Sequence, residues 1–259
     1  MRAKLALEAD LTQTWDPQTY GKNGAFVPAL AGGVLEWLAA QPGERILDLG
    51  CGDGRLTERL AAAGSVVRGV DASAQMVTAA RTRGVAADEA NAEALPYADA
   101  EFHAVFSNAA LHWVRDHEAM LREVHRVMRP GGRFVAEMGG HGNIAAIRIA
   151  LMAVLERHGY GDLENDVNYY PTQEAYTRRL EHAGFRVEKI ALIPRPTPLE
   201  AGGMNGWLRT FRRGVLDRLP ANLRDRIVEE TATLIARALC DEDGNWVADY
   251  VRLRFIARK

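Results

Sequence analysis

Short apolar runs alternate with amphipathic stretches along the first half of the chain. The apolar runs are rich in Val, Ile, Leu and Phe, as is typical of buried strands. We predict these strands at 45–50, 66–71, 102–107 and 133–140, with a weaker strand within 85–96. Between them, apolar residues recur at helical spacing, and a glycine or proline ends each stretch. We predict these helices at 26–40, 55–64, 73–84 and 117–129.

The strict alternation of strands and helices between 45 and 140 predicts a doubly wound α/β fold, in which helices cover both faces of a parallel sheet. In such a sheet, ligands bind beyond the carboxyl ends of the strands. A chain of 259 residues can form one such domain, because α/β domains often exceed the usual length of roughly 100–150 residues.

The second half of the chain is less regular. It contains four helical patterns, which lie at 143–159, 172–184, 204–219 and 220–239. A strand is predicted at 185–193, where we expect Pro194, Pro196 and Pro198 to interrupt it. An alternating pattern predicts a closing strand at 246–259. We interpret the two helices before this strand as an insertion that covers the ligand-binding edge.

The sequence LDLGCGDG, residues 47–54, joins the first strand to the next helix. A dinucleotide-binding loop has the spacing Gly-x-Gly-x-x-Gly, but Gly50, Gly52 and Gly54 place the third glycine one residue early. Asp48 and Asp53 would also repel a pyrophosphate, whereas carboxylates suit a ligand that carries an ammonium and a sulfonium group. The loop therefore favours S-adenosylmethionine over NAD.

Asp71 ends the second predicted strand. A carboxylate at this position can accept hydrogen bonds from both ribose hydroxyls of an adenosine ligand. The alternative is that Asp71 caps the following helix, for which Ser73 is the other candidate. By itself Asp71 does not separate the two ligands.

The amino-acid composition argues against several classes of binding partner. Lys and Arg total 32 and Asp and Glu total 34, so a formal net charge of −2 gives no broad basic surface for nucleic acid. Cys51 and Cys240 are the only cysteines, so we expect no disulfide framework and no metal site. Glu8 and Asp10 fall where a signal peptide would be apolar, and no apolar run is long enough for a membrane span. We expect a cytoplasmic protein without a nucleic-acid or membrane partner.

Five segments, taken in order, resemble the class I S-adenosylmethionine-dependent methyltransferases between Arg45 and about Gly140. They are LDLGCGDG, the strand-end Asp71, NAEALP, VFSNAALHW and VMRPGGRFV. The SNAALHW stretch, with Trp15 and Tyr20 upstream, is similar to the trans-aconitate methyltransferase branch. The resemblance implies a mostly parallel seven-stranded sheet with an antiparallel last strand, and a helical cap over the carboxyl edge of the strands.

The same resemblance implies one domain over 1–259. Its parts would be an N-terminal helical cap (1–44), a cofactor-binding half (45–140), the second half of the sheet with helices (141–196), a helical lid (197–245) and a closing strand (246–259).

The resemblance also implies roles for individual residues. The glycines would line the methionyl part of the cofactor, Asp48 would orient the loop, and Asp71 would hold the ribose with Met76 near the adenine. Asn91 stands where the family usually has Asp, but its amide can still donate and accept at the adenine edge. The full implied cofactor set is Tyr20, Asp48, Gly50, Cys51, Gly52, Gly54, Asp71, Ala72, Met76, Asn91, Ala92, Glu93 and Asn108.

Methyl transfer from a sulfonium is an in-line displacement, and it needs a general base only if the acceptor carries a proton at neutral pH. His112 is the candidate base, and the alternative is that it orients a ligand without moving a proton. Cys51 has no paired base and is expected to be a small loop residue. The candidate substrate-binding residues are His112, Trp113, Arg148, Tyr169, Tyr170 and Trp207.

The arginines of the lid have two interpretations. A carboxylate, which would already be ionised and need no base, could be clamped by Arg148, Arg195, Arg209 or Arg212. Alternatively Arg209, Arg212 and Arg213 form one exposed helix face.

We expect methyl transfer to a small molecule, with S-adenosylhomocysteine as the second product. O-methylation of a carboxylate or hydroxyl is favoured over C- or N-methylation. A non-catalytic cofactor-binding module is the alternative from another class, and the glycine spacing disfavours an NAD-dependent oxidoreductase. Methylene transfer to a lipid is disfavoured because the lid is not apolar enough. We expect a monomer or a weak homodimer.

Overall fold

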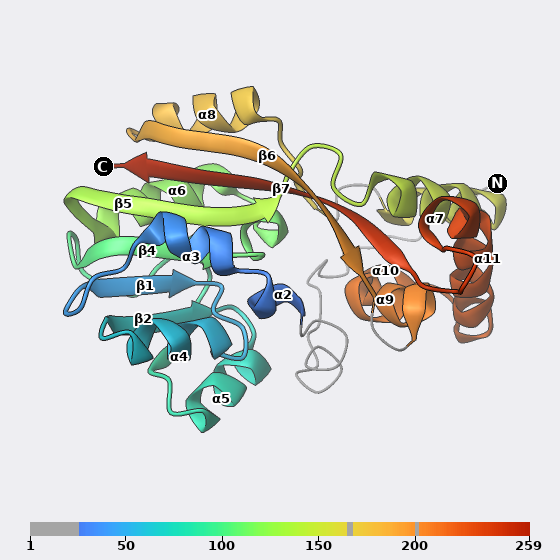
Figure 1. The fold of residues 1–259 in the computed structure, drawn as a ribbon, viewed down its shortest axis with the longest axis horizontal. Coiled ribbons are helices and arrows are strands. Elements are labelled where there is room, and N and C mark those ends of the chain that lie inside the picture. Colours follow the sequence, from blue (N-terminus) through green and yellow to red (C-terminus); the bar gives the residue numbers. More distant parts are fainter. Residues whose placement is uncertain (1–25, 165–167, 200–201) are drawn as a thin grey trace, which may run out of the picture.

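Seven strands form one sheet in the computed structural model, which describes residues 26–164, 168–199 and 202–259. The strand order is β3-β2-β1-β4-β5-β7-β6, and β7 runs antiparallel to both of its neighbours while the pairs from β3 to β5 are parallel (Figure 1). This confirms the predicted topology. The strands are β1 Arg45–Leu49, β2 Val66–Asp71, β3 Ala87–Glu89, β4 Phe102–Asn108, β5 Met128–Gly139, β6 Arg186–Pro198 and β7 Val247–Arg258.

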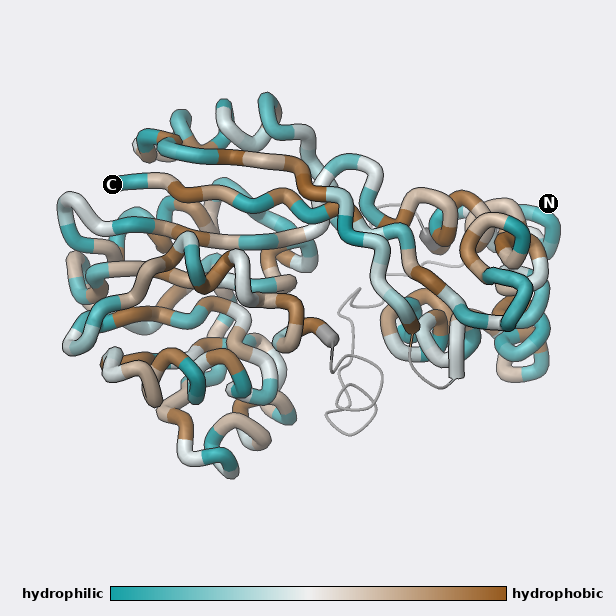
Figure 2. Tube along the Cα trace, viewed as in Figure 1, coloured by the Kyte–Doolittle hydropathy of each residue, from teal (hydrophilic) through white to brown (hydrophobic). Residues whose placement is uncertain are grey.

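Helices cover both faces of the sheet, as the alternating pattern predicts. Side chains of successive strand residues point to opposite faces, so Ile46 of β1 joins one apolar core and Leu47 joins the other. Figure 2 shows hydrophobic positions concentrated along the central strands, while the outer helix α8 is largely hydrophilic. The covering helices are α3 Gly32–Leu38, α4 Arg55–Ala62, α5 Ala74–Thr82, α6 His117–Val127 and α8 Gln173–His182.

The prediction of one continuous helix at 26–40 is wrong. It is divided into α2 Phe26–Ala29 and α3, and α3 ends at Ala39 in a left-handed conformation. Inside α3, a Cβ on Gly33 would lie 2.4 Å from an Arg254 guanidinium nitrogen. The glycine pair at 32–33 lets this arginine approach the helix but weakens helix formation.

The prediction that three prolines interrupt the sixth strand is also wrong. β6 continues to Pro198 and pairs only with β7, so it is an edge strand. Pro194 lies opposite Val251, whose carbonyl accepts from Gly140 on the other side of β7. The nitrogen of Pro194 therefore faces away from β7, where no N–H is needed. The same holds for Pro196, two residues later. Prolines along an exposed edge also hinder pairing with another chain.

A second group of helices lies beyond the end of the sheet to which β1 and β5 point (Figure 1). These helices share an apolar core with Ala248 and Tyr250, at the start of β7. They are α7 Ala145–Arg157, α9 Gly203–Phe211, α10 Arg213–Leu216 and α11 Ala221–Leu239. None of the helices in the described ranges is long and apolar enough to cross a membrane. We propose that α7 belongs with the predicted lid, because it packs against α11.

Candidate functional site

The glycine-rich turn follows β1 and leads into α4. The amides of Gly50 and Cys51 both donate to the carbonyl of Val70, which ties the turn to β2. Gly50 has φ +74°, and a Cβ on it would lie 2.2 Å from the Cβ of Ala110. The turn therefore passes directly over the segment that follows β4, and only glycine fits at this position.

Two carboxylates lie below and beside this turn. Asp48 is buried and accepts a hydrogen bond from Thr57 Oγ1 at 2.6 Å, and burial raises its pKa to about 7. Asp71 accepts from the amides of Gly52 and Ser73, each at 2.9 Å, and burial raises its pKa as well. Ser73, not Asp71, is the N-cap of α5. Each Asp71 oxygen has a further lone pair for a ligand hydroxyl.

The side chain of Cys51 points away from the turn. It packs with Val77, Ala80 and Ala87 in a small apolar cluster, and burial raises the pKa of its thiol. Cys51 can thus offer a ligand its backbone only. Asp53 is paired with the guanidinium groups of Arg55 and Arg83, so its charge is compensated outside the ligand position.

The predicted adenine segment follows β3. Asn91 Oδ1 accepts from the amide of Glu93, and the Glu93 carboxylate accepts from the amide of Asp116 at the start of α6. Ala92 packs on the main core, Ala72 is exposed and Met76 is buried under the turn into α5. The carboxylate of Glu93 therefore ties the segment to the start of α6, and it also accepts from Asn91 Nδ2 at 3.4 Å.

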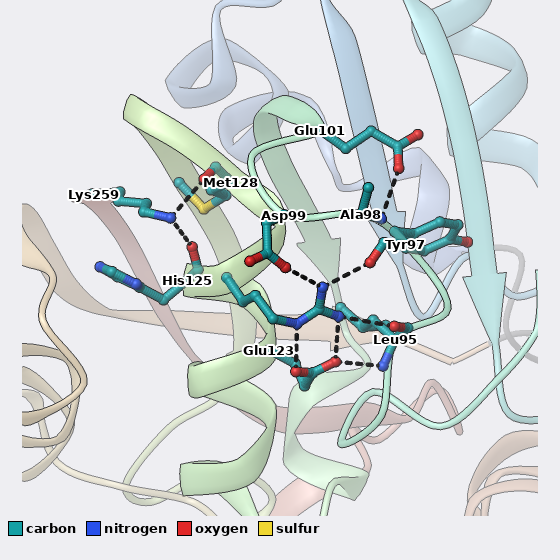
Figure 3. A network of polar contacts seen from close by, with 10 residues as sticks. Leu95, Tyr97, Ala98, Asp99, Glu101, Glu123, His125, Met128 and Lys259 are labelled. Atoms are coloured by element: carbon teal, nitrogen blue, oxygen red, sulfur yellow. Dashed lines mark hydrogen bonds and ion pairs between the residues drawn. The ribbon is translucent and has the colours of Figure 1, made fainter.

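Arg126 of α6 fixes the rest of this segment. Its guanidinium donates to the carbonyls of Leu95 and Tyr97 and to the carboxylates of Asp99 and Glu123, at 2.7–2.9 Å. Figure 3 shows these groups gathered around one guanidinium, with Glu123 also accepting from the Leu95 amide. The adenine segment thus rests on a network that is anchored in the helix.

His112 lies in a 3-10 turn, Leu111–Trp113, directly after β4. It is buried, and the amide of Gly139 donates to its Nδ1 at 3.3 Å. Burial, followed by the charges of Arg252 and Arg212, holds the pKa of His112 well below its ordinary value. Its ring is therefore neutral at pH 7, and an accepting Nδ1 leaves the proton on Nε2.

Tyr170 lies beside His112, with ring centroids 5.8 Å apart. Its hydroxyl donates to Asn168 Oδ1, which also accepts from Arg212 Nη1 at 2.7 Å. The guanidinium of Arg148 lies 5.4 Å from the Tyr170 ring centroid. Trp113 also contacts the His112 ring. These predicted substrate residues therefore come together at one place.

Two other predicted residues lie differently. Tyr169 faces the opposite way from its neighbour, because its ring packs 4.7 Å from the His117 ring, below Arg179. Trp207 donates from Nε1 to the hydroxyl of Tyr250 at 2.7 Å, and its ring lies 5.7 Å from the guanidinium of Arg212, so it borders the site behind these two residues. Asn108 ends β4 opposite Glu137, on the approach to the turn. Tyr20 and Trp15 lie outside the described residues.

The interpretation of the three lid arginines as one exposed face is wrong for Arg212. Arg209 and Arg213 are exposed and pair with Asp225 and Asp217. Arg212 is 1% exposed, because α9 ends just before it and the chain turns inward.

Three further residues lie at this place that the sequence motifs do not single out, which are Asn168, Tyr250 and Arg252. Arg252 lies opposite Gly139 in the register of β5 and β7, and its guanidinium stacks 4.2 Å from the Tyr250 ring centroid. The available signal was the arginine at an inward position of the closing strand, two residues from Arg254. Within the described ranges, no group of three or more His, Cys, Asp or Glu side chains is arranged to hold a metal.

Comparisons with known proteins identify methyltransferases as the relatives of this chain. A family described as a methyltransferase domain matches residues 47–136. An uncharacterized methyltransferase of Schizosaccharomyces pombe is 36% identical over 256 residues, which are 95% of this chain and 98% of the relative. A demethylmenaquinone methyltransferase of Mycobacterium sp. (strain KMS) is 37% identical over 161 residues, 57% of this chain and 70% of the relative.

A solved structure shows the same fold. It is an S-adenosylmethionine-dependent methyltransferase from Mesorhizobium loti, with a TM-score of 0.54 and 21% identity, covering 88% of this chain and 96% of its own. The match over nearly the whole chain, the glycine turn over the sheet edge and the seven-stranded topology lead to one conclusion. The chain belongs to the class I S-adenosylmethionine-dependent methyltransferases.

Proposed function

We propose that this enzyme transfers the methyl group of S-adenosylmethionine to a carboxylate oxygen of a small organic acid. The cofactor would lie on the glycine turn, with Asp71 at its ribose and Asn91 at its adenine. Its methyl group would face the turn that carries His112. The products would be a methyl ester and S-adenosylhomocysteine.

The protonation of His112 carries this proposal. Its Nδ1 is occupied by the Gly139 amide, and its pKa lies well below the ordinary value because of burial and two nearby arginines. A neutral ring with its proton on Nε2 can donate a hydrogen bond to an acceptor oxygen, but it is a poor base. An acceptor that arrives already ionised needs no base, and a carboxylate meets that condition at neutral pH.

The charges around His112 support the same acceptor. Arg252 and Arg212 are each less than 10% exposed and lie close enough to lower the pKa of His112. Buried cations favour an anionic ligand over a neutral alcohol or amine. A hydroxyl or amine acceptor would need a proton acceptor in place of His112.

The pH dependence of the reaction tests this proposal. Methyl transfer to an acid in single-turnover conditions is expected to be independent of pH between about 8 and 10, above the pKa of about 7 of Asp48, because His112 stays neutral and the acceptor stays ionised throughout this range. The measurement is transfer of labelled methyl from S-adenosylmethionine to a panel of small carboxylic acids. A rate that rises tenfold per pH unit would indicate that a proton must leave the acceptor.

A substitution at His112 separates the two roles considered for it. His112→Asn keeps an oxygen that can accept from the Gly139 amide, so we expect a loss of less than about tenfold in kcat. Removal of a general base would reduce kcat by roughly 10²–10⁴-fold. Trp113→Phe serves as the control for altered packing beside the same ring.

Asp71 tests the cofactor half of the proposal. Asp71→Ala should weaken S-adenosylhomocysteine binding by about 1–3 kcal/mol, since it leaves ribose hydroxyls and the Gly52 amide without an acceptor. Isothermal titration calorimetry measures this directly. Asp53→Ala is the matched control, because that carboxylate pairs with Arg55 and Arg83, and its affinity should stay unchanged. Equal affinities for all three proteins would contradict the assigned position of the ribose.

A further inference from the structure

Arg252 has no role in the fold that accounts for its burial. Its side chain is 6% exposed, and its Nε has no hydrogen-bond partner. Within the described part of the chain, no carboxylate forms an ion pair with it. Its guanidinium lies over the Tyr250 ring, 4.2 Å from the ring centroid. An uncompensated buried guanidinium costs stability, so a ligand is the natural source of its missing charge.

Arg254 and Arg195, which lie near Arg252 on the sheet, do not share this condition. Arg254 lies two residues further on the same face of β7, and together with Arg195 it binds the buried carboxylate of Glu137. That carboxylate is already shared by two arginines. Arg252 therefore differs from Arg254 and Arg195 in having no carboxylate partner within the described residues. It lies at the end of the sheet, opposite Gly139, whose amide donates to His112.

The proposed reaction limits which acceptor group this guanidinium can bind. When a carboxylate attacks a sulfonium, the two opposite charges disappear as the ester and thioether form. A guanidinium held on the attacking carboxylate would stabilise the reactant more than the transition state and would slow the step. Arg252 would assist only if it holds an anionic group that does not react.

We infer that Arg252 binds a second anionic group of the acceptor, so that the substrate carries at least two acidic groups and is methylated on the one that Arg252 does not hold. This inference rests on the proposed carboxylate methylation. The Tyr250 ring would hold the Arg252 guanidinium in place by stacking against it. His112 would donate from Nε2 to the reacting carboxylate. Arg252 is thus a residue that determines substrate specificity.

The test is calorimetric titration of the full chain, loaded with S-adenosylhomocysteine, with α,ω-dicarboxylates of two to six carbons between the acid groups and with the monoamide of each. Wild type is expected to bind a dicarboxylate at least thirtyfold more tightly than its monoamide. Arg252→Met should remove this preference, whereas Arg258→Met, on the same strand and paired with Glu188 at the surface, should keep it. Arg252→Lys keeps the charge without the planar fork and should retain part of the preference.

Stability separates ligand binding from a structural role. Arg252→Met should bind S-adenosylhomocysteine normally and have an unchanged or higher Tm, because an unpaired buried charge is replaced by an apolar chain. A lower Tm together with a uniform loss of all ligands would overturn the inference, and so would an unchanged preference or a wild type that binds none of the diacids.

The outcomes also separate this inference from the proposed function. Diacid binding that depends on Arg252, with a product that is not an ester, would refute carboxylate methylation and leave the anion site in place. An ester product with the same KM for wild type and Arg252→Met would support carboxylate methylation and refute the anion site at Arg252.

Discussion

Glu137→Ala is expected to lower the free energy of unfolding by about 3–5 kcal/mol, because it breaks a buried ion-pair cluster. Glu137 is 2% exposed and accepts hydrogen bonds from Arg195 of β6 and Arg254 of β7. Its removal leaves two guanidinium groups at the end of the sheet without a counter-charge. Urea denaturation of the two proteins measures the difference.

An exposed carboxylate provides the matched control. Glu188 also accepts from two arginines, Arg186 and Arg258, but it lies at the surface, so Glu188→Ala should cost less than about 1 kcal/mol. Glu137→Gln should fall between the two, because an amide oxygen can accept but carries no charge. If Glu137→Ala and Glu188→Ala lower the free energy of unfolding equally, burial of the Glu137 ion pairs adds nothing to their effect on stability.

Gly50→Ala is expected to reduce stability by roughly 2–5 kcal/mol and to weaken cofactor binding by more than tenfold. The left-handed backbone at φ +74° costs about 1–2 kcal/mol for a residue with a side chain. The new Cβ would also lie 2.2 Å from the Cβ of Ala110, an overpacking that costs about 1–3 kcal/mol more. Because Ala110 precedes the turn that carries His112, the clash would displace both the glycine turn and the His112 turn.

Two variants separate these causes. Gly84→Ala has a similar positive φ with nothing within 4 Å of the new Cβ, so it reports the backbone cost alone. Ala110→Gly added to Gly50→Ala removes the clash and should recover the difference in both unfolding free energy and cofactor affinity. If the double variant binds no better than Gly50→Ala, the contact between the glycine turn and the segment after β4 is not what limits cofactor binding.

The first half of the fold could be predicted because its signals are local. β1, β4 and the second part of β5 are apolar runs, whereas β3 is the weak strand Ala87–Glu89. The glycine spacing excludes a pyrophosphate without knowledge of any distant residue. The three prolines of β6 show the limit of this approach. Whether a proline interrupts a strand depends on which side of the strand faces a neighbour, and that follows from the sheet order.

The candidate site was only partly predictable for the same reason. His112, Trp113 and Tyr170 come together as expected, since two of them follow β4 directly. Arg252 and Tyr250 join them only because β7 inserts between β5 and β6, which sequence spacing does not reveal. Arg212 was grouped with its exposed neighbours, and a break between α9 and α10 turns it inward. The resemblance to the trans-aconitate methyltransferase branch stays a prediction.

The position of the transferred methyl group tests the central claim most directly. The enzyme is incubated with S-adenosylmethionine labelled with ¹³C in the methyl group and with the acids of the panel, and the product is followed by NMR. Our account predicts that the sulfonium signal is replaced by a methyl ester signal that mild alkali converts to labelled methanol. A label that appears on nitrogen, on carbon or in an alkali-stable ether would contradict it.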